Sequence, residues 1–247
     1  MMDYVDLLKH VKYTYSAHNS PVIAFGGSYG GMLTAWMRMK YPHVINGAIA
    51  ASAPILYFEG GDVTPESFFV FTTRTFAETK KAGQEKPDGH CAKIIRESWD
   101  HIMTVKKNIN TQASKLKEVL KLCKVPKTEK DIEDVYEHFA SGLQYEAMTD
   151  YPTKSDFLEP MPPNPVNVSC SFLEDIPIQT DYLVDQPVGA EVPMTARAEL
   201  VLKGLNKAAE VYFNYKKDPK YCANFDQTDA TGSNLDAGRG WDALACN

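Results

Sequence analysis

The stretch VIAFGGSYGGMLTAWMRMKYPHVINGAIAASA, residues 22–53, is the part of the sequence that decides how the fold is interpreted. Four apolar residues, 22–25, end at a glycine-rich turn and predict a short buried strand. The apolar residues of MLTAWMRMK (32–40) predict a helix that stops near Pro42. Residues 45–53 predict a second buried strand. The N-terminal part is therefore expected to run strand, turn, helix, strand.

The rest of the chain is dominated by helical patterns. Apolar residues recur at helical spacing in several segments from about residue 60 onward. A proline-rich turn at 159–165 interrupts this region, and an Asp- and Gly-rich tail follows it. Asp3 is the expected N-cap of the first helix. We expect helices over 3–15, from Thr64, over 91–109 and 112–123, after Thr128, and over 195–215.

Composition and charge exclude several classes of protein. The 247 residues contain 26 Lys and Arg against 32 Asp and Glu, a net charge of −6. An acidic chain without a basic cluster lacks the electrostatic footprint of a nucleic-acid-binding protein. No run of about 18 apolar residues is present, so no membrane-spanning helix is predicted. The composition is that of a soluble globular protein.

The five cysteines are widely spaced and form no CxxC pair, which argues against a structural metal or thioredoxin-type site. Disulfides in an oxidising compartment are the expected alternative, although the odd count leaves one cysteine over. The sequon at Asn167 makes this residue a glycosylation candidate. No apolar leader begins the sequence, so we expect that the start of the protein is missing.

The pattern Gly26-x-Ser28-x-Gly30 lies between the first predicted strand and the following helix. A nucleophile elbow has this context, because its serine occupies a strained turn whose flanking positions leave no room for side chains. The alternative is an ordinary glycine-rich turn, such as one that holds a phosphate. The turn lacks the lysine of a P-loop and does not read GxGxxG.

The segment 21–55 resembles the nucleophile region of the prolyl carboxypeptidase and dipeptidyl peptidase II family of serine exopeptidases. The similarity extends through MTDYPTKSDFLEPMPPNPVNVSC (148–170) and, more loosely, to Gly240-Trp241 and Ala245-Cys246. It implies a partial α/β-hydrolase fold with a helical insertion that caps the active site. The expected domains are a hydrolase-core part over 1–60, a helical cap over 61–220 and a truncated return segment over 221–247.

The resemblance also implies roles for individual residues. Ser28 would be the nucleophile, and the backbone N–H of Tyr29 would be one oxyanion donor. The family pattern of disulfides that pin the insertion implies the pairs Cys91–Cys170 and Cys123–Cys222, with Cys246 pairing elsewhere. No metal and no organic cofactor are expected.

Two branches of the family compete. Asp229-Ala230-Thr231-Gly232 resembles the segment with which the dipeptidyl branch binds a substrate ammonium, so we favour release of N-terminal dipeptides after Pro or Ala. A Pro-X carboxypeptidase and a non-catalytic scaffold are the alternatives. Peptides are the implied partners, with no nucleic acid and no membrane, and a homodimer is compatible with this interpretation. The implied location is lysosomal, vesicular or secreted.

The catalytic base is the missing part of the pattern. In α/β-hydrolases the acid and the histidine follow the serine along the chain. The last histidine here is His138, in the helical region, so all six are interpreted as surface or packed helix histidines. We expect an internal fragment whose acid and base lie beyond it. Its two predicted strands would leave unpaired edges and exposed apolar surface.

Overall fold

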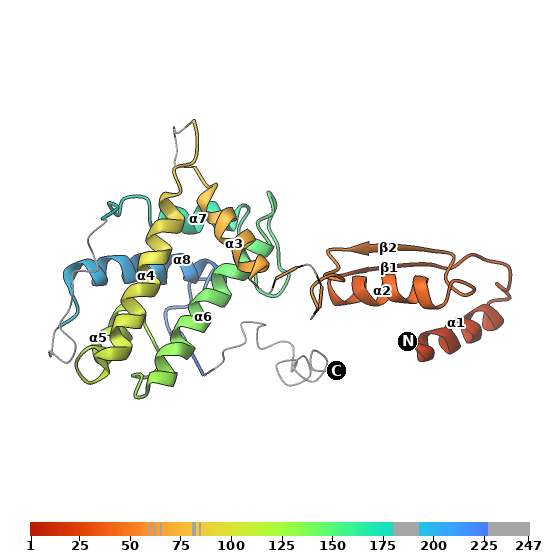
Figure 1. Ribbon diagram of the computed structural model, residues 1–247, viewed down its shortest axis with the longest axis horizontal. Helices are drawn as coiled ribbons and strands as arrows, with labels where there is room; N and C mark the ends of the chain where they lie inside the picture. Colours follow the sequence, from red (N-terminus) through yellow and green to blue (C-terminus); the bar gives the residue numbers. More distant parts are fainter. Residues whose placement is uncertain are drawn as a thin grey trace. The chain divides into compact units, whose positions relative to one another are not determined.

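The structure is a computed structural model of the chain, and it describes residues 1–58, 60–61, 63–64, 66–80, 83, 85–179 and 193–226. The chain divides into two compact units, Met1–Ser67 and Phe68–Asn247. Figure 1 shows the elements of each unit. None of the described helices combines the length and the apolar character that crossing a membrane requires.

The N-terminal unit contains four elements: α1 (Met2–Thr14), β1 (Ile23–Gly27), α2 (Tyr29–Lys40) and β2 (Gly47–Ala51). The two strands are parallel, with Phe25 opposite Ile49. The connecting helix α2 packs along them, as Figure 1 shows. Both strands and α1 therefore lie within two residues of their predicted positions, whereas α2 begins three residues before the predicted helix start at residue 32. The predicted cap at Asp3 is wrong, because the N-cap of α1 is Met1, two residues earlier, and Asp3 lies in the first turn of the helix.

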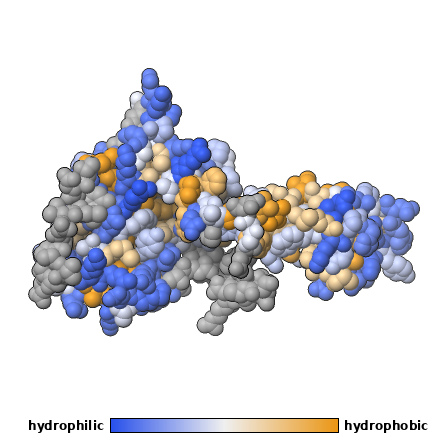
Figure 2. All heavy atoms as spheres, in the orientation of Figure 1, coloured by the Kyte–Doolittle hydropathy of each residue, from blue (hydrophilic) through white to orange (hydrophobic). Residues whose placement is uncertain are grey.

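On the face of the sheet opposite α2, the apolar side chains are exposed in the described part of the chain. Ile23, Phe25 and Ile49 share that face in the parallel register and are 55%, 80% and 64% exposed. Apolar residues are visible on the surface of this unit in Figure 2. The expectation that the strands are buried is thus wrong for the described residues. The expectation of exposed apolar surface on a two-stranded sheet is confirmed.

The second unit is helical and has an extensive core. α8 packs against four other helices, and Figure 1 shows it crossing α4 and α6. Thr128 and Asp131 form the capping box that the sequence predicts at the start of α6. The sequence analysis missed α7, which begins at Pro165 inside the predicted proline-rich turn. The helices are α3 (Ser67–Ala77), α4 (His90–Lys107), α5 (Ile109–Val119), α6 (Glu129–Met148), α7 (Pro165–Ser171) and α8 (Ala196–Phe213).

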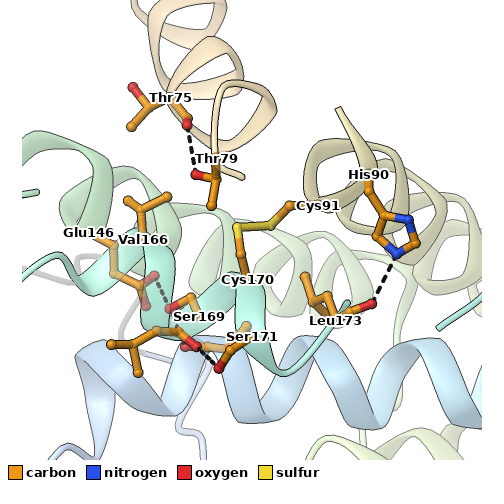
Figure 3. Close-up of a disulfide and its surroundings, with 12 residues drawn as sticks. Thr75, Thr79, His90, Cys91, Glu146, Val166, Ser169, Cys170, Ser171 and Leu173 are labelled. Atoms are coloured by element: carbon orange, nitrogen blue, oxygen red, sulfur yellow. Dashed lines mark hydrogen bonds between the residues drawn. A yellow bond between two sulfur atoms is a disulfide. The ribbon is translucent and has the colours of Figure 1, made fainter. Parts of the chain in front are cut away.

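Two disulfides cross-link this unit. Cys91–Cys170 joins the start of α4 to α7, and Figure 3 shows it between the two helices. Cys123–Cys222 joins the segment after α5 to the segment after α8. These are the pairs that the family resemblance implies, and Cys246 lies outside the described residues. The described part of the return segment, 221–226, packs in the helical core through Ala223 and Phe225.

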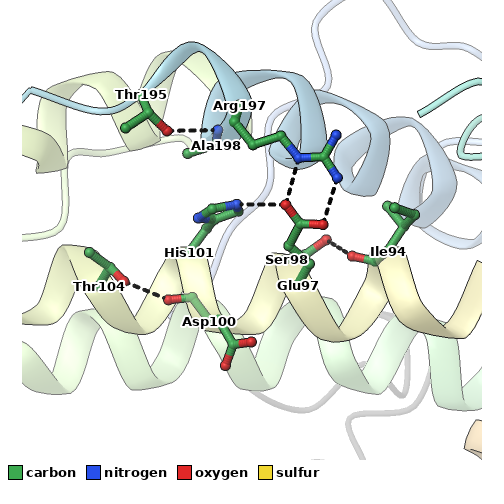
Figure 4. Close-up of polar contacts among 9 residues, drawn as sticks. All are labelled: Ile94, Glu97, Ser98, Asp100, His101, Thr104, Thr195, Arg197 and Ala198. Carbon is green, nitrogen blue, oxygen red and sulfur yellow. Dashed lines mark hydrogen bonds and ion pairs between the residues drawn. The ribbon is translucent and has the colours of Figure 1, made fainter. Parts of the chain in front are cut away.

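A buried ion pair connects α4 to α8. Arg197 donates two hydrogen bonds of 2.7 Å to the two carboxylate oxygens of Glu97. His101 Nε2 lies 3.2 Å from the same carboxylate, as Figure 4 shows. Burial lowers the pKa of His101, although its hydrogen bond with Glu97 acts in the opposite direction. Because the side chain of Glu97 is only 3% exposed and that of Arg197 only 13%, the pair depends on both partners being present.

A buried carboxyl lies where α6, α7 and α8 meet. Figure 3 shows Glu146 directed at Ser169, and Glu146 Oε2 is 2.5 Å from Ser169 Oγ. Ser169 Oγ also lies 3.1 Å from the carbonyl oxygen of Ala208. A hydroxyl carries one hydrogen, so if Ser169 donates it to the carbonyl, Glu146 must supply the proton of the other bond. Burial raises the pKa of the Glu146 carboxyl well above its ordinary value. Burial therefore favours the neutral form of this carboxyl, although its hydrogen bond with Ser169 acts on the pKa in the opposite direction.

Candidate active site

Ser28 lies between the last residue of β1 and the first residue of α2. Its backbone has φ 54° and ψ −124°, a combination that a residue with a side chain rarely adopts. Such strain costs about 1–3 kcal/mol and persists only where the surroundings impose it. The residue is exposed. Its conformation and exposure are those that a nucleophile elbow requires.

Two backbone hydrogen bonds hold Ser28 in this conformation. Its N–H donates to the carbonyl oxygen of Ala51 at the end of β2, at 3.0 Å. Its carbonyl oxygen accepts from the N–H of Met32 in the first turn of α2, also at 3.0 Å. Among the described residues none hydrogen-bonds the Ser28 hydroxyl. The backbone is therefore fixed, and the side chain is left for another partner.

The surrounding glycines differ in what they contribute. A Cβ at Gly26 would lie 2.5 Å from the carbonyl oxygen of Gly30, and one at Gly31 would lie 2.7 Å from that of Ala51. A Cβ at Gly30 would meet no heavy atom within 4 Å in the described part of the chain. The expectation that both motif glycines are required for space is thus confirmed for Gly26 and wrong for Gly30. Gly31 is the second position that has no room for a side chain, because the last residue of β2, Ala51, packs against α2 at this point.

Tyr29 is the first helical residue after the candidate nucleophile. The N–H groups of a first turn have no acceptor within their own helix, and the helix dipole adds partial positive charge there. The first turn of α2 contains no acidic residue that would oppose this charge. The start of α2 is therefore suited to an oxygen that gains negative charge beside Ser28.

The histidines do not complete a catalytic group at Ser28. In the N-terminal unit, all three histidines are exposed, and in the helical unit all three are buried. His90 Nε2 donates to the carbonyl of Leu173, and His138 stacks on Phe213 with the ring centroids 4.2 Å apart. The interpretation as surface or packed histidines is confirmed. The six are His10, His18 and His43 in the first unit and His90, His101 and His138 in the second.

The remaining candidates are distributed as follows. Asn167 is exposed on α7, so its side chain is accessible for a glycan, whereas the sequon's Ser169 is buried. Asp229, the candidate for binding a substrate ammonium, lies outside the described residues. Within the described ranges, no three His, Cys, Asp or Glu side chains gather in a way that could hold a metal ion.

Neither the pair of Glu97 with Arg197 nor the buried carboxyl of Glu146 was predicted from the sequence. Glu97 and Arg197 are 100 positions apart, and no spacing rule connects them. One signal was available: Glu97 shares the buried face of α4 with Ile94 and His101, and a carboxylate on such a face requires a partner. The identity of that partner depends on how α8 packs.

Comparison with known proteins places the whole chain in one family. The family model described as "Serine carboxypeptidase S28" matches residues 1–247. Lysosomal Pro-X carboxypeptidases of Homo sapiens and Pongo abelii are each 38% identical over 247 residues, which is 100% of this chain and 43% of theirs. The "Putative serine protease pcp-1" of Caenorhabditis elegans is 33% identical over 91% of this chain and 37% of its own length.

The chain thus spans 43% of the length of the mammalian relatives named here. The similarity covers both the elbow and the helical unit with its two disulfides. The S28 serine peptidases are hydrolases with an α/β-hydrolase-like fold, and the parallel strands around Ser28 agree with such a fold only in part. The chain belongs to the serine carboxypeptidase S28 family.

Proposed function

We propose that this protein is a serine exopeptidase whose nucleophile is Ser28, and that it removes a C-terminal residue after proline. The conformation of Ser28 is the observation that carries the catalytic part of the proposal. A strained, exposed serine between a strand and a helix has little structural use, but it presents a hydroxyl to a substrate. The names of the relatives support the substrate class.

The proposed chemistry is acyl transfer. Ser28 Oγ attacks the scissile carbonyl carbon, a C–O bond forms, and the carbonyl oxygen becomes an oxyanion near the Tyr29 N–H. When this intermediate collapses, the C–N bond breaks, the amine leaves with a proton, and an acyl-enzyme remains. Water then hydrolyses the ester and restores the hydroxyl. A base must take the serine proton, and we assign no described residue to that role.

The two branches of the family bind opposite ends of a peptide. A carboxypeptidase must hold a terminal carboxylate, and a dipeptidyl peptidase must hold a terminal ammonium. The relatives reported above carry the name of the first activity. The dipeptidyl alternative, release of N-terminal dipeptides after Pro or Ala, stays a prediction that depends on Asp229. One assay with blocked substrates decides between them.

Under this proposal, each unit corresponds to a different domain of an α/β-hydrolase. The N-terminal unit, approximately residues 1–60, would belong to the hydrolase core. The helical unit, approximately 61–220, would be its cap, with 221–247 returning towards the core. A lysosomal or secreted location is supported by the two disulfides, which persist in oxidising compartments, and by the names of the mammalian relatives.

The test compares two substrates and two serine variants of the purified protein. An N-acetylated peptide ending in Pro-Phe with a free carboxylate should be cleaved, and a Lys-Pro amide with a free N-terminus should not. Ser28→Ala should lower kcat at least about 10⁴-fold, because the covalent step is lost. Ser20→Ala removes an exposed hydroxyl from the same unit and should leave kcat unchanged.

The results separate the claims. Cleavage of the Lys-Pro amide alone would replace the carboxypeptidase assignment with the dipeptidyl one and keep Ser28 as the nucleophile. Equal turnover by Ser28→Ala would remove Ser28 from the mechanism. Labelling by a fluorophosphonate, which modifies activated serines, should occur at Ser28 in the unmodified protein and be absent from Ser28→Ala.

A further inference from the structure

A pocket opens on the helical unit where α3, α4 and α6 approach one another. Its volume is about 240 Å³. A cavity of about 150 Å³ already accommodates a benzene ring, so this pocket can hold an aromatic or a large aliphatic side chain. The residues of its lining that matter here are Phe69, Phe76, Arg96, Trp99, Tyr136 and Gln144.

The walls of the pocket are largely aromatic. Trp99 and Tyr136 meet edge to face, with their ring centroids 5.1 Å apart. Both are only partly buried, and Phe69 on α3 is 53% exposed. Packing of α3 buries Phe76 and leaves the other rings of the wall accessible. An apolar group that entered the pocket would cover these rings and gain their contact area.

Arg96 is the only charged residue in the lining. It is exposed and has no hydrogen bond or ion pair with any described residue. The two other arginines that the structure describes in this unit are paired, Arg74 with Glu78 and Arg197 with Glu97. A guanidinium at the edge of an apolar pocket is suited to a ligand that carries a carboxylate beside an apolar group.

Gln144 adds a polar group of a different kind. Its side chain lines the same pocket and has no hydrogen-bond partner among the described residues. An amide can donate to a peptide carbonyl and accept from a peptide N–H at once. A peptide would use both the amide and the guanidinium, whereas a fatty acid would use the guanidinium alone. The lining therefore favours a peptide.

We propose that this pocket binds the C-terminal residue of a peptide, with the apolar side chain against Trp99 and Phe76 and the free carboxylate paired with Arg96. The inference rests on the proposed peptidase function, which makes such peptides the natural ligands. It is a statement about the helical unit alone, because every lining residue belongs to that unit. It gives this unit a role in selecting peptides by their last residue.

The test measures binding in the Ser28→Ala background, so that no peptide is consumed. Isothermal titration calorimetry compares an N-acetylated tripeptide ending in Phe, its C-terminal amide, and octanoate. The free acid should bind at least about tenfold more tightly than the amide and than octanoate. Arg96→Gln should remove the preference for the acid over the amide. Arg74→Gln, an exposed arginine outside the lining, should retain it.

Three results would overturn the pocket assignment. These are equal affinity for acid and amide, equal loss of preference in Arg74→Gln and Arg96→Gln, and tighter binding of octanoate than of the peptide. A second variant leaves the charge of Arg96 unchanged. Ala92 lines the pocket and is partly exposed, so Ala92→Phe should fill the pocket and weaken binding of the acid. Unchanged affinity in this variant would also overturn the assignment.

The proposed peptidase function and the pocket assignment can each be overturned without the other. Labelling of Ser28 in the unmodified protein, together with no acid preference in the binding assay, would retain the peptidase and overturn the pocket. An acid preference that depends on Arg96, together with no labelling of Ser28, would support the carboxylate site and overturn the catalytic role of Ser28.

Discussion

The two units hold their shape by different means. In the N-terminal unit, the turn at Ser28 is held by two main-chain hydrogen bonds, one to the end of β2 and one to the first turn of α2. Its apolar core is small and centres on Val5, Met37 and Ile45. The helical unit has a continuous core across α4, α5, α6, α7 and α8, two disulfides, the Glu97–Arg197 ion pair and the buried carboxyl of Glu146.

The two units thus differ in which residues determine their structure. The geometry at Ser28 depends on the absence of side chains at Gly26 and Gly31, and on backbone groups that any sequence would supply. The helical unit depends on specific side chains that meet across long separations. A substitution in the first unit should therefore act mainly by placing a side chain where the backbone leaves no room for it. A substitution in the second unit should act mainly by removing a side chain that another residue contacts.

The largest expected effect breaks the helical unit at its ion pair. Arg197→Met leaves the buried carboxylate of Glu97 without its cation, which should lower the free energy of unfolding by about 3–5 kcal/mol. Lys203→Met is the control, because Lys203 lies on the same helix and its pair with Glu199 is exposed. Its effect should be about 0–1 kcal/mol. Urea unfolding followed by circular dichroism measures both, and similar values would contradict the prediction.

The second effect breaks the N-terminal unit at its turn. Gly26→Ala brings a methyl group within 2.5 Å of the Gly30 carbonyl oxygen, so the elbow must shift, at a cost of about 1–3 kcal/mol. Gly30→Ala meets no such obstacle and should be neutral or stabilising by up to about 1 kcal/mol, since alanine favours the helix. Hydrogen exchange of the β1 and α2 amides measures the difference. Equal exchange in the two variants would disprove it.

The third effect tests the helical unit through pH and is the smallest for each pH unit, at about 1.4 kcal/mol. Because the pKa of Glu146 is raised in the folded protein, the unfolded chain releases this proton first as pH rises. Glu146 therefore costs no stability below its unfolded pKa of about 4.3, and above it costs about 1.4 kcal/mol per pH unit up to its folded pKa. Glu146→Gln should remove this loss and be more stable than the unmodified protein at neutral pH.

The control for this pH effect is a nearby carboxyl in a more accessible place. Burial also raises the pKa of Asp150, but this side chain is only partly buried and accepts the N–H of Val166. Asp150→Asn should give a smaller pH-dependent gain than Glu146→Gln. Unfolding by urea at pH 5 and pH 8 provides the comparison. A stability difference between Glu146→Gln and the unmodified protein that is the same at both pH values would refute the neutral carboxyl.

Much of the local structure could be predicted from the sequence. The strand, glycine-rich turn and helix around Ser28 follow from short-range patterns, and the capping box of α6 follows from Thr128 and Asp131. α7 was missed because Pro165 reads as a turn residue, although proline is also suited to the first position of a helix. The exposure of β1 could not be predicted from the four apolar residues 22–25, because burial depends on what packs against them.

The candidate site was predictable only in part, for the same reason. The motif identifies Ser28, but which glycine needs its space depends on where Ala51 lies, and Ala51 belongs to the next strand. The pocket around Arg96 combines residues of three helices, and the partners of Glu97 and Glu146 come from other helices. No local pattern contains such long-range information.

The two disulfides have a consequence for the chain as a covalent object. Their spans, 91–170 and 123–222, overlap without one enclosing the other. A single proteolytic cut anywhere between Cys91 and Cys222 therefore leaves two fragments still joined by at least one bridge, and a cut between Cys123 and Cys170 leaves them joined by both. A helical unit built in this way can be nicked once and still keep its pieces together.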